Sequence, residues 1–101
     1  MKKTTASYRE GLIKDLTRPA EAAAYLNAAL EDGSTDGFLM ALRDIAEAKG
    51  MTQLSRKANL NRESMYRMLS SKGNPRLSSL ACILESAGLT LAVAVRGRGV
   101  A

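Results

Sequence analysis

Hydrophobic side chains recur every three to four residues in three stretches of the chain. Each stretch ends in a turn that contains glycine, and the first begins at Pro19, a residue suited to the first turn of a helix. Such spacing places the apolar side chains on one face of a helix. The pattern therefore predicts three amphipathic helices, which cover residues 19–31, 38–49 and 77–87.

Two shorter helical segments lie in residues 52–69, and a loop at 73–75 follows them. Thr52 can cap the first segment and Asn61 the second. Asn59 occupies a turn position that requires a positive φ, which asparagine tolerates better than most residues. The side chains expected to face the core are Leu54, Ala58, Leu60, Met65 and Met68. This is the spacing of a helix-turn-helix, whose second helix enters a major groove while the first crosses the phosphates.

The hydrophobic period changes to two near the C-terminus. Leucine or valine alternates with smaller or polar residues in LTLAVAVR, at Leu89, Leu91, Val93 and Val95, which predicts one strand. A lone strand leaves its backbone N–H and C=O groups unpaired. We therefore expect it to pair with the same strand of a second copy in a symmetric dimer, or with the segment from Tyr8 to Leu16.

The two ends of the chain carry little apolar content. Residues 1–17 contain only a few large apolar side chains and are interrupted by Gly11, so we expect the first six to be disordered and the rest to pack loosely. Residues 97–101 are expected to form a mobile tail. Residues 18–96 then make up one domain, which we expect to be mostly α, with about five helices and one C-terminal β-strand.

Composition excludes several classes of function. The 101 residues include no histidine and one cysteine, which leaves no Ser-His-Asp or Cys-His arrangement and no ordinary zinc site. Cys82 is expected to be a buried, small apolar residue. No apolar run is long enough for a membrane span, and none follows the basic N-terminus to form a signal peptide. We expect a cytoplasmic protein that is not an enzyme and has no cofactor, metal or membrane partner.

Charge is divided unevenly between the two halves. Residues 1–50 carry seven basic and eight acidic side chains, a net of −1, whereas residues 51–101 carry eight basic and two acidic, a net of +6. Most of the excess surrounds the second short helix and is opposed there only by Glu63. It comes from Arg56, Lys57, Arg62, Arg67, Lys72 and Arg76. Such a field suits a polyanion.

The exposed side chains of the second short helix suit base edges in a major groove. Arg62 and Arg67 can fork onto guanine, while Glu63 can accept from cytosine or simply complement the helix dipole. Asn61 can pair with adenine if its side chain is not used for capping, and Tyr66 can contact a phosphate or a thymine methyl. The residues suited to phosphates are Thr52, Gln53, Ser55, Arg56, Lys72 and Arg76.

The stretch GMTQLSRKANLNRESMYRMLS, followed by GNPRLSSLACILESAGLTL, resembles HigA-like antidote proteins of host-killer modules. These proteins carry an XRE-type, lambda-repressor-like helix-turn-helix domain. The similarity extends upstream through AAAYLNAALEDGSTDGFLMALRDIAEAKGM and covers roughly residues 15–96. The chain departs from the family pattern at Asn59, where glycine is most common, at Ser55, where alanine is usual, and at Arg76, where relatives have a smaller or acidic residue.

The resemblance implies two partners. One is a small basic toxin of the RelE type, encoded beside the antidote and neutralised by direct binding. The other is a double-stranded DNA operator in their shared promoter, bound by a homodimer. A strand of the toxin is then a further possible partner for residues 89–95. Two other interpretations stay open: an orphan prophage-type regulator without a toxin, and a protein-binding adaptor that uses the fold as a scaffold. The net charge of +6 in the second half argues against the adaptor.

Overall fold

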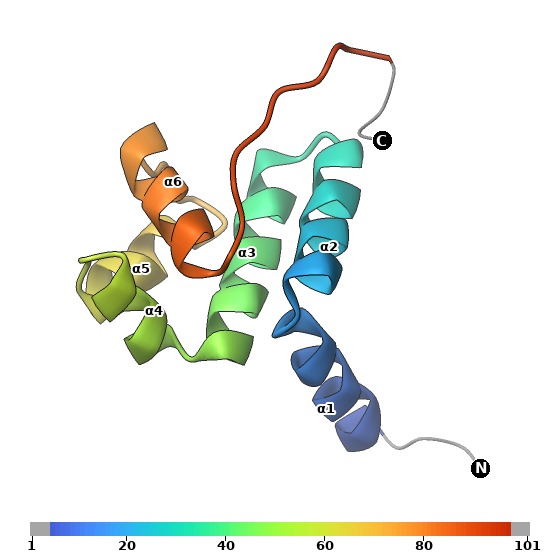
Figure 1. The fold of residues 1–101 in the computed structure, drawn as a ribbon, viewed down its shortest axis with the longest axis vertical. Coiled ribbons are helices and arrows are strands. Elements are labelled where there is room, and N and C mark those ends of the chain that lie inside the picture. Colours follow the sequence, from blue (N-terminus) through green and yellow to red (C-terminus); the bar gives the residue numbers. More distant parts are fainter. Residues whose placement is uncertain (1–4, 98–101) are drawn as a thin grey trace.

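Six helices and no strand make up residues 5–97, the part of the chain described by this computed structural model (Figure 1). They are α1 (Thr5–Leu16), α2 (Pro19–Glu31), α3 (Thr35–Lys49), α4 (Met51–Lys57), α5 (Arg62–Met68) and α6 (Leu77–Ser86). None of these helices is long and apolar enough to cross a membrane. The expected mostly α class is thus correct, with one helix more than predicted and without the strand.

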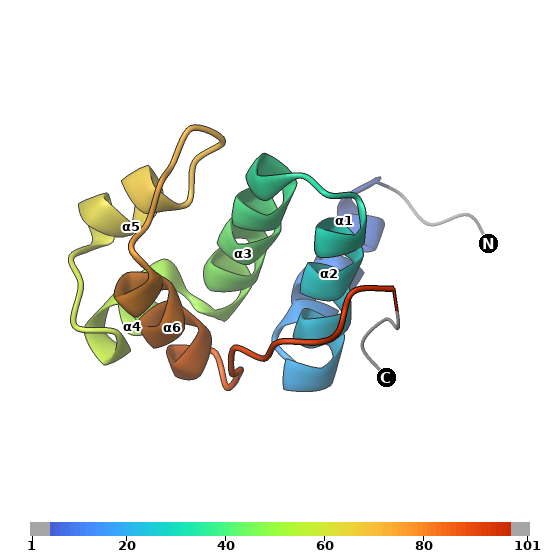
Figure 2. The same cartoon turned by 90° about the horizontal axis from the view of Figure 1, so that it is seen from above.

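Helix α3 occupies the centre of the fold. It lies between the α1–α2 pair and the group formed by α4, α5 and α6 in both views (Figures 1 and 2). Its predicted apolar stripe is fully buried at Leu42 and Ile45, and the helix packs against α1, α2 and α4. The hydroxyl of Ser34 caps its first turn by accepting from the N–H of Gly37 at 3.0 Å. Gly50, with φ of 105°, ends it where the sequence predicted.

Helix α1 was not predicted. The sequence of residues 5–16 has few apolar side chains, but they are sufficient to dock the helix against α2 and α3. Leu16 is buried in the core and Leu12 packs on its edge. The disorder expected for the first six residues and the mobility expected for the tail fall largely on residues 1–4 and 98–101, which lie outside the described residues.

The predicted C-terminal strand is absent from the described residues. Residues 89–95 instead follow an irregular path from the end of α6 toward α2 (Figure 2). The N–H of Leu89 donates to the carbonyl of Leu84 at 2.8 Å, and the Leu89 side chain packs against the core. Beyond it, Leu91, Val93 and Val95 are exposed. Alternation predicts which side chains share a face, but a strand also needs a neighbour, and residues 5–97 offer none.

One side chain expected to be buried is not. Cys82 is exposed on α6, whereas its neighbours Ile83 and Leu84 are buried. The apolar stripe of α6 runs through Ile83, Leu84 and Ala87, and Cys82 lies outside it. A cysteine next to core residues in the sequence is therefore on the other face of the helix.

The loop after α5 depends on glycine at position 73. Its N–H donates to the carbonyl of Ser70 at 2.9 Å, and a β-carbon there would collide with the backbone carbonyl oxygen of Met68. We expect Gly73→Ala to lower the free energy of unfolding by about 1–3 kcal/mol, because backbone must shift to admit the methyl group. Urea denaturation followed by circular dichroism measures the change.

The matched control is Gly11→Ala. Gly11 lies within α1 with open space around it, so alanine is expected to raise stability by about 0.5–1 kcal/mol. Equal stabilities for Gly73→Ala and the wild type would show that the loop adapts without cost.

Candidate nucleic-acid interface

The turn between α4 and α5 has the geometry predicted from the sequence. Asn59 has φ of 57° and is the only non-glycine residue with a positive φ among the described residues. The N–H of Leu60 donates to the carbonyl of Ser55 at 2.8 Å, which closes the turn. Leu54, Ala58 and Met65 are buried as expected, and Leu60 and Met68 are half-buried at the edge of the core. Two short helices are thus joined tightly through a shared apolar core.

Asn61 caps α5. Its side-chain Oδ1 accepts from the N–H of Ser64 at 2.6 Å. The amide oxygen that would help to recognise adenine is therefore engaged in holding the helix, and we assign Asn61 to capping rather than to base recognition.

Thr52 does not cap α4, contrary to prediction. The helix begins at Met51, with Gly50 in the N-cap position and no side-chain cap. The positive φ of Gly50 lets the chain turn directly from α3 into α4, so the helix starts before Thr52. Thr52 lies exposed in the first turn, and its carbonyl accepts from the hydroxyl of Ser55 at 2.8 Å.

Ser55 was expected to contact a phosphate, but the structure places it in the core. Its side chain faces the core, with only 4% of its surface exposed, and its hydroxyl is used within α4. Only a small side chain fits at this inward position, which explains why alanine is usual at position 55 in the antidote proteins that the sequence resembles. Ser55 therefore has a structural role and cannot reach a bound phosphate.

The basic side chains form a solvent-facing set on α4, α5 and the chain that leads into α6. Its members are Arg56, Lys57, Arg62, Arg67, Lys72 and Arg76, and Gln53 and Glu63 are exposed alongside them. In the described part of the chain, the one ion pair joins Arg43 to Glu47 and involves none of these cations. Their charge is consequently available to a ligand.

Tyr66 is placed differently from its neighbours on α5. It is half-buried and packs against the edge of the core, instead of projecting fully into solvent. Its ring lies against two guanidinium groups: the Cζ of Arg43 is 5.1 Å from the ring centroid and that of Arg62 is 5.7 Å. Both distances are within the range of cation–π interactions.

Arg43 is a residue that the sequence did not single out. It comes from α3, and its Nε donates to Oε1 of Glu47 at 3.0 Å. The spacing of Arg43 and Glu47 predicts an ordinary surface pair on one helix. Its contact with Tyr66 depends on how α3 lies relative to α5, for which the sequence carries no signal.

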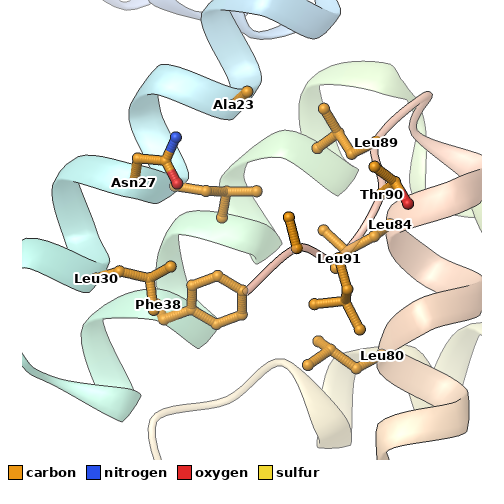
Figure 3. Close-up of a pocket in the computed structure, with 11 residues that line it drawn as sticks. Ala23, Asn27, Leu30, Phe38, Leu80, Leu84, Leu89, Thr90 and Leu91 are labelled. Atoms are coloured by element: carbon orange, nitrogen blue, oxygen red, sulfur yellow. The ribbon is translucent and has the colours of Figure 1, made fainter. Parts of the chain in front are cut away.

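An apolar groove of about 460 Å³ lies apart from α4 and α5 (Figure 3). It is enclosed by α2 on one side, α6 on the other, and the start of the C-terminal segment. Its lining consists of Ala23, Leu26, Asn27, Leu30, Phe38, Leu80, Leu84 and residues 89–92. No group of His, Cys, Asp and Glu within the described residues is arranged to hold a metal ion.

Comparisons with known proteins point to one family. A family model described as "Probable addiction module antidote protein" matches residues 9–95. A protein of Haemophilus influenzae, described only as uncharacterized, is 36% identical over 82 residues, which are 81% of this chain and 84% of that protein. No solved structure matches the chain.

The role of Asn61 can be tested by separating capping from base recognition. Asn61→Ala is expected to lower the free energy of unfolding by about 1 kcal/mol, because the N–H of Ser64 loses its acceptor. Asn61→Ser keeps a capping oxygen and is expected to stay close to the wild type in urea denaturation. If serine destabilised the protein as much as alanine, the cap would not be the source of the effect.

Proposed function

We propose that this chain, which belongs to the family of probable addiction module antidote proteins, is an antitoxin that also represses its own promoter. In this proposal α4 and α5 bind a double-stranded DNA operator, and the protein neutralises a small basic toxin of the RelE type. The observation that carries the DNA-binding part is the set of unpaired cations around the capped helix α5.

The exposed face of α5 supplies the base contacts in this proposal. Arg62 and Arg67 are exposed, and neither is neutralised by an ion pair. A guanidinium group can donate two parallel hydrogen bonds to the O6 and N7 of guanine. Glu63 is exposed in the first turn, where it complements the helix dipole and can accept from cytosine. Tyr66 supports this face through its ring instead of reaching out from it.

The phosphate contacts of the proposal flank that helix on both sides. Thr52, Gln53 and Arg56 are exposed on α4, and Lys72 and Arg76 are exposed between α5 and α6. Contacts to phosphates orient a protein on the duplex without carrying sequence information. Their cations also displace counterions, which makes affinity depend on salt.

A homodimer would extend recognition to two half-sites, about 34–36 Å apart or a multiple of that spacing. Exposed apolar side chains support association: Val93 is fully exposed, and Leu30 and Leu91 are about half exposed at the groove. Leu30 and Leu91 lie together in the lining of the groove, and exposed apolar side chains gathered in this way are typical of protein contacts. The second copy would bury these side chains, without the strand pairing expected from the sequence. Leu89 is already used in the core of its own chain.

The DNA-binding part predicts different behaviour for a phosphate contact and a base contact. Lys72→Ala should reduce the magnitude of the negative slope of log K against log salt by about one, and it should weaken binding about equally on all duplexes. Arg67→Ala should cost about 1–3 kcal/mol on the promoter fragment and reduce its preference over a scrambled duplex. Fluorescence anisotropy over a salt series measures both quantities.

Lys14→Ala provides the control, because Lys14 is an exposed cation on α1, away from α4 and α5. It should leave both the salt slope and the preference unchanged. A wild-type slope near zero would refute DNA binding by this surface.

The antitoxin part predicts that the chain relieves the toxicity of a small basic protein encoded beside it. Co-expression should restore growth, and the two proteins should co-purify. Arg67→Ala should neutralise the toxin as well as the wild type does, because loss of a proposed base contact leaves the rest of the chain intact. An isolated gene with no toxic neighbour would instead identify a transcription regulator without a toxin.

A further inference from the structure

We infer that Arg43 is a positioning residue for sequence recognition: from α3 it supports the Tyr66 ring, against which Arg62 is held ready to meet a base. The inference rests on the proposed function and adds to it a residue outside the helix-turn-helix. It follows from three contacts that run in series from Glu47 to Arg62.

The series begins with an ion pair between Arg43 and Glu47. The Nε of Arg43 donates to Glu47 at 3.0 Å within the same helix. The side chain of Arg43 is 34% exposed, so part of it is enclosed by neighbours. A guanidinium group is planar and rigid, and a fixed Nε leaves its face in a defined plane. Arg43 can therefore offer a stable surface to the ring of Tyr66.

The contact between Arg43 and Tyr66 joins α3 directly to α5. Helix α3 packs against α4, and α4 packs against α5. The guanidinium of Arg43 on α3 meets the ring of Tyr66 on α5 directly, with its Cζ 5.1 Å from the ring centroid. The position of Tyr66 is thereby set by the central helix as well as by its own short helix.

The final contact orders Arg62. Arg62 and Tyr66 are four residues apart on α5, so they lie on the same face of the helix. The Arg62 guanidinium is 5.7 Å from the ring centroid, while no carboxylate in the described residues pairs with it. Its charge stays free for a ligand. Ordering a long side chain before binding reduces the entropy lost in the complex.

The charges in the cluster are consistent with this division of roles. Two guanidinium groups beside one ring repel each other, and Glu47 compensates the charge of Arg43 alone. Glu47 thus compensates the charge of Arg43, which supports the ring, whereas no carboxylate in the described residues compensates the charge of the exposed Arg62. Removing Arg43 should leave Arg62 present but less ordered.

The test measures the binding constant for the promoter fragment and the binding constant for a scrambled duplex, and takes the ratio of the first to the second. Arg43→Ala should lower this ratio about 2- to 10-fold, the cost of ordering one long side chain on binding. Tyr66→Leu should lower it similarly, whereas Tyr66→Phe, which keeps the ring, should retain the wild-type ratio. The double variant Arg43→Ala, Arg62→Ala should have the same ratio as Arg62→Ala alone, because the side chain that Arg43 positions is already absent.

Lys49→Ala is the matched control, since it removes a cation from α3 that has no contact with the ring. It should not change the ratio. Circular dichroism and urea denaturation of each variant establish that the fold is intact, and the ratio is compared only among folded variants. Additive losses from Arg43→Ala and Arg62→Ala would overturn the positioning role.

Three outcomes distinguish failure of this inference from failure of the proposed function. Arg43→Ala could reduce the magnitude of the slope of log K against log salt by about one and leave the ratio unchanged. Arg43 would then be a phosphate contact and not a positioning residue. If the wild type bound promoter and scrambled duplexes equally, both the proposed function and this inference would fail. A wild-type preference that survives in Arg43→Ala would overturn the inference alone.

Discussion

Burial of the apolar stripe of α3 is the interaction on which the other elements depend. Leu42 and Ile45 have no exposed surface, and α3 packs against α1, α2 and α4. Both the N-terminal helices and the α4–α5 pair are therefore anchored on the same helix (Figures 1 and 2). Loss of apolar contacts within such a close-packed centre would loosen both sides, because neither the α1–α2 pair nor the short helices have a separate core of comparable size.

The proposed DNA surface combines a rigid interior with an unneutralised exterior. Helices α4 and α5 have seven residues each, too short to be stable by themselves in water. They are held by Leu54 and Met65 in the core, by the left-handed turn at Asn59, and by the cap from Asn61. Polar groups on the inner side are satisfied within the protein. The cations outside remain free, which is the arrangement expected of a surface that meets phosphates.

The cationic surface and the apolar groove involve different parts of the molecule. The groove is lined by α2, α6 and the start of the C-terminal segment, with one residue from α3 and none from α4 or α5. In the proposed function, this separation would let the α4–α5 surface bind DNA while a second copy covers the apolar side chains at the groove. Helix α3 touches both regions, through Phe38 at the groove and Arg43 beside Tyr66. Helix α3 therefore contributes residues to both the apolar groove and the cationic surface.

The sequence by itself determined the features whose causes lie within a few residues. Apolar spacing predicted α2, α3 and α6, and the turn at Asn59 and the cap at Asn61 follow from local backbone and hydrogen-bonding preferences. The tertiary structure decided what depends on distant neighbours: the docking of α1, the contact of Arg43 with Tyr66, and the path of residues 89–95. Alternating residues there favoured a strand, but a ladder requires a second strand, and no local pattern can supply one.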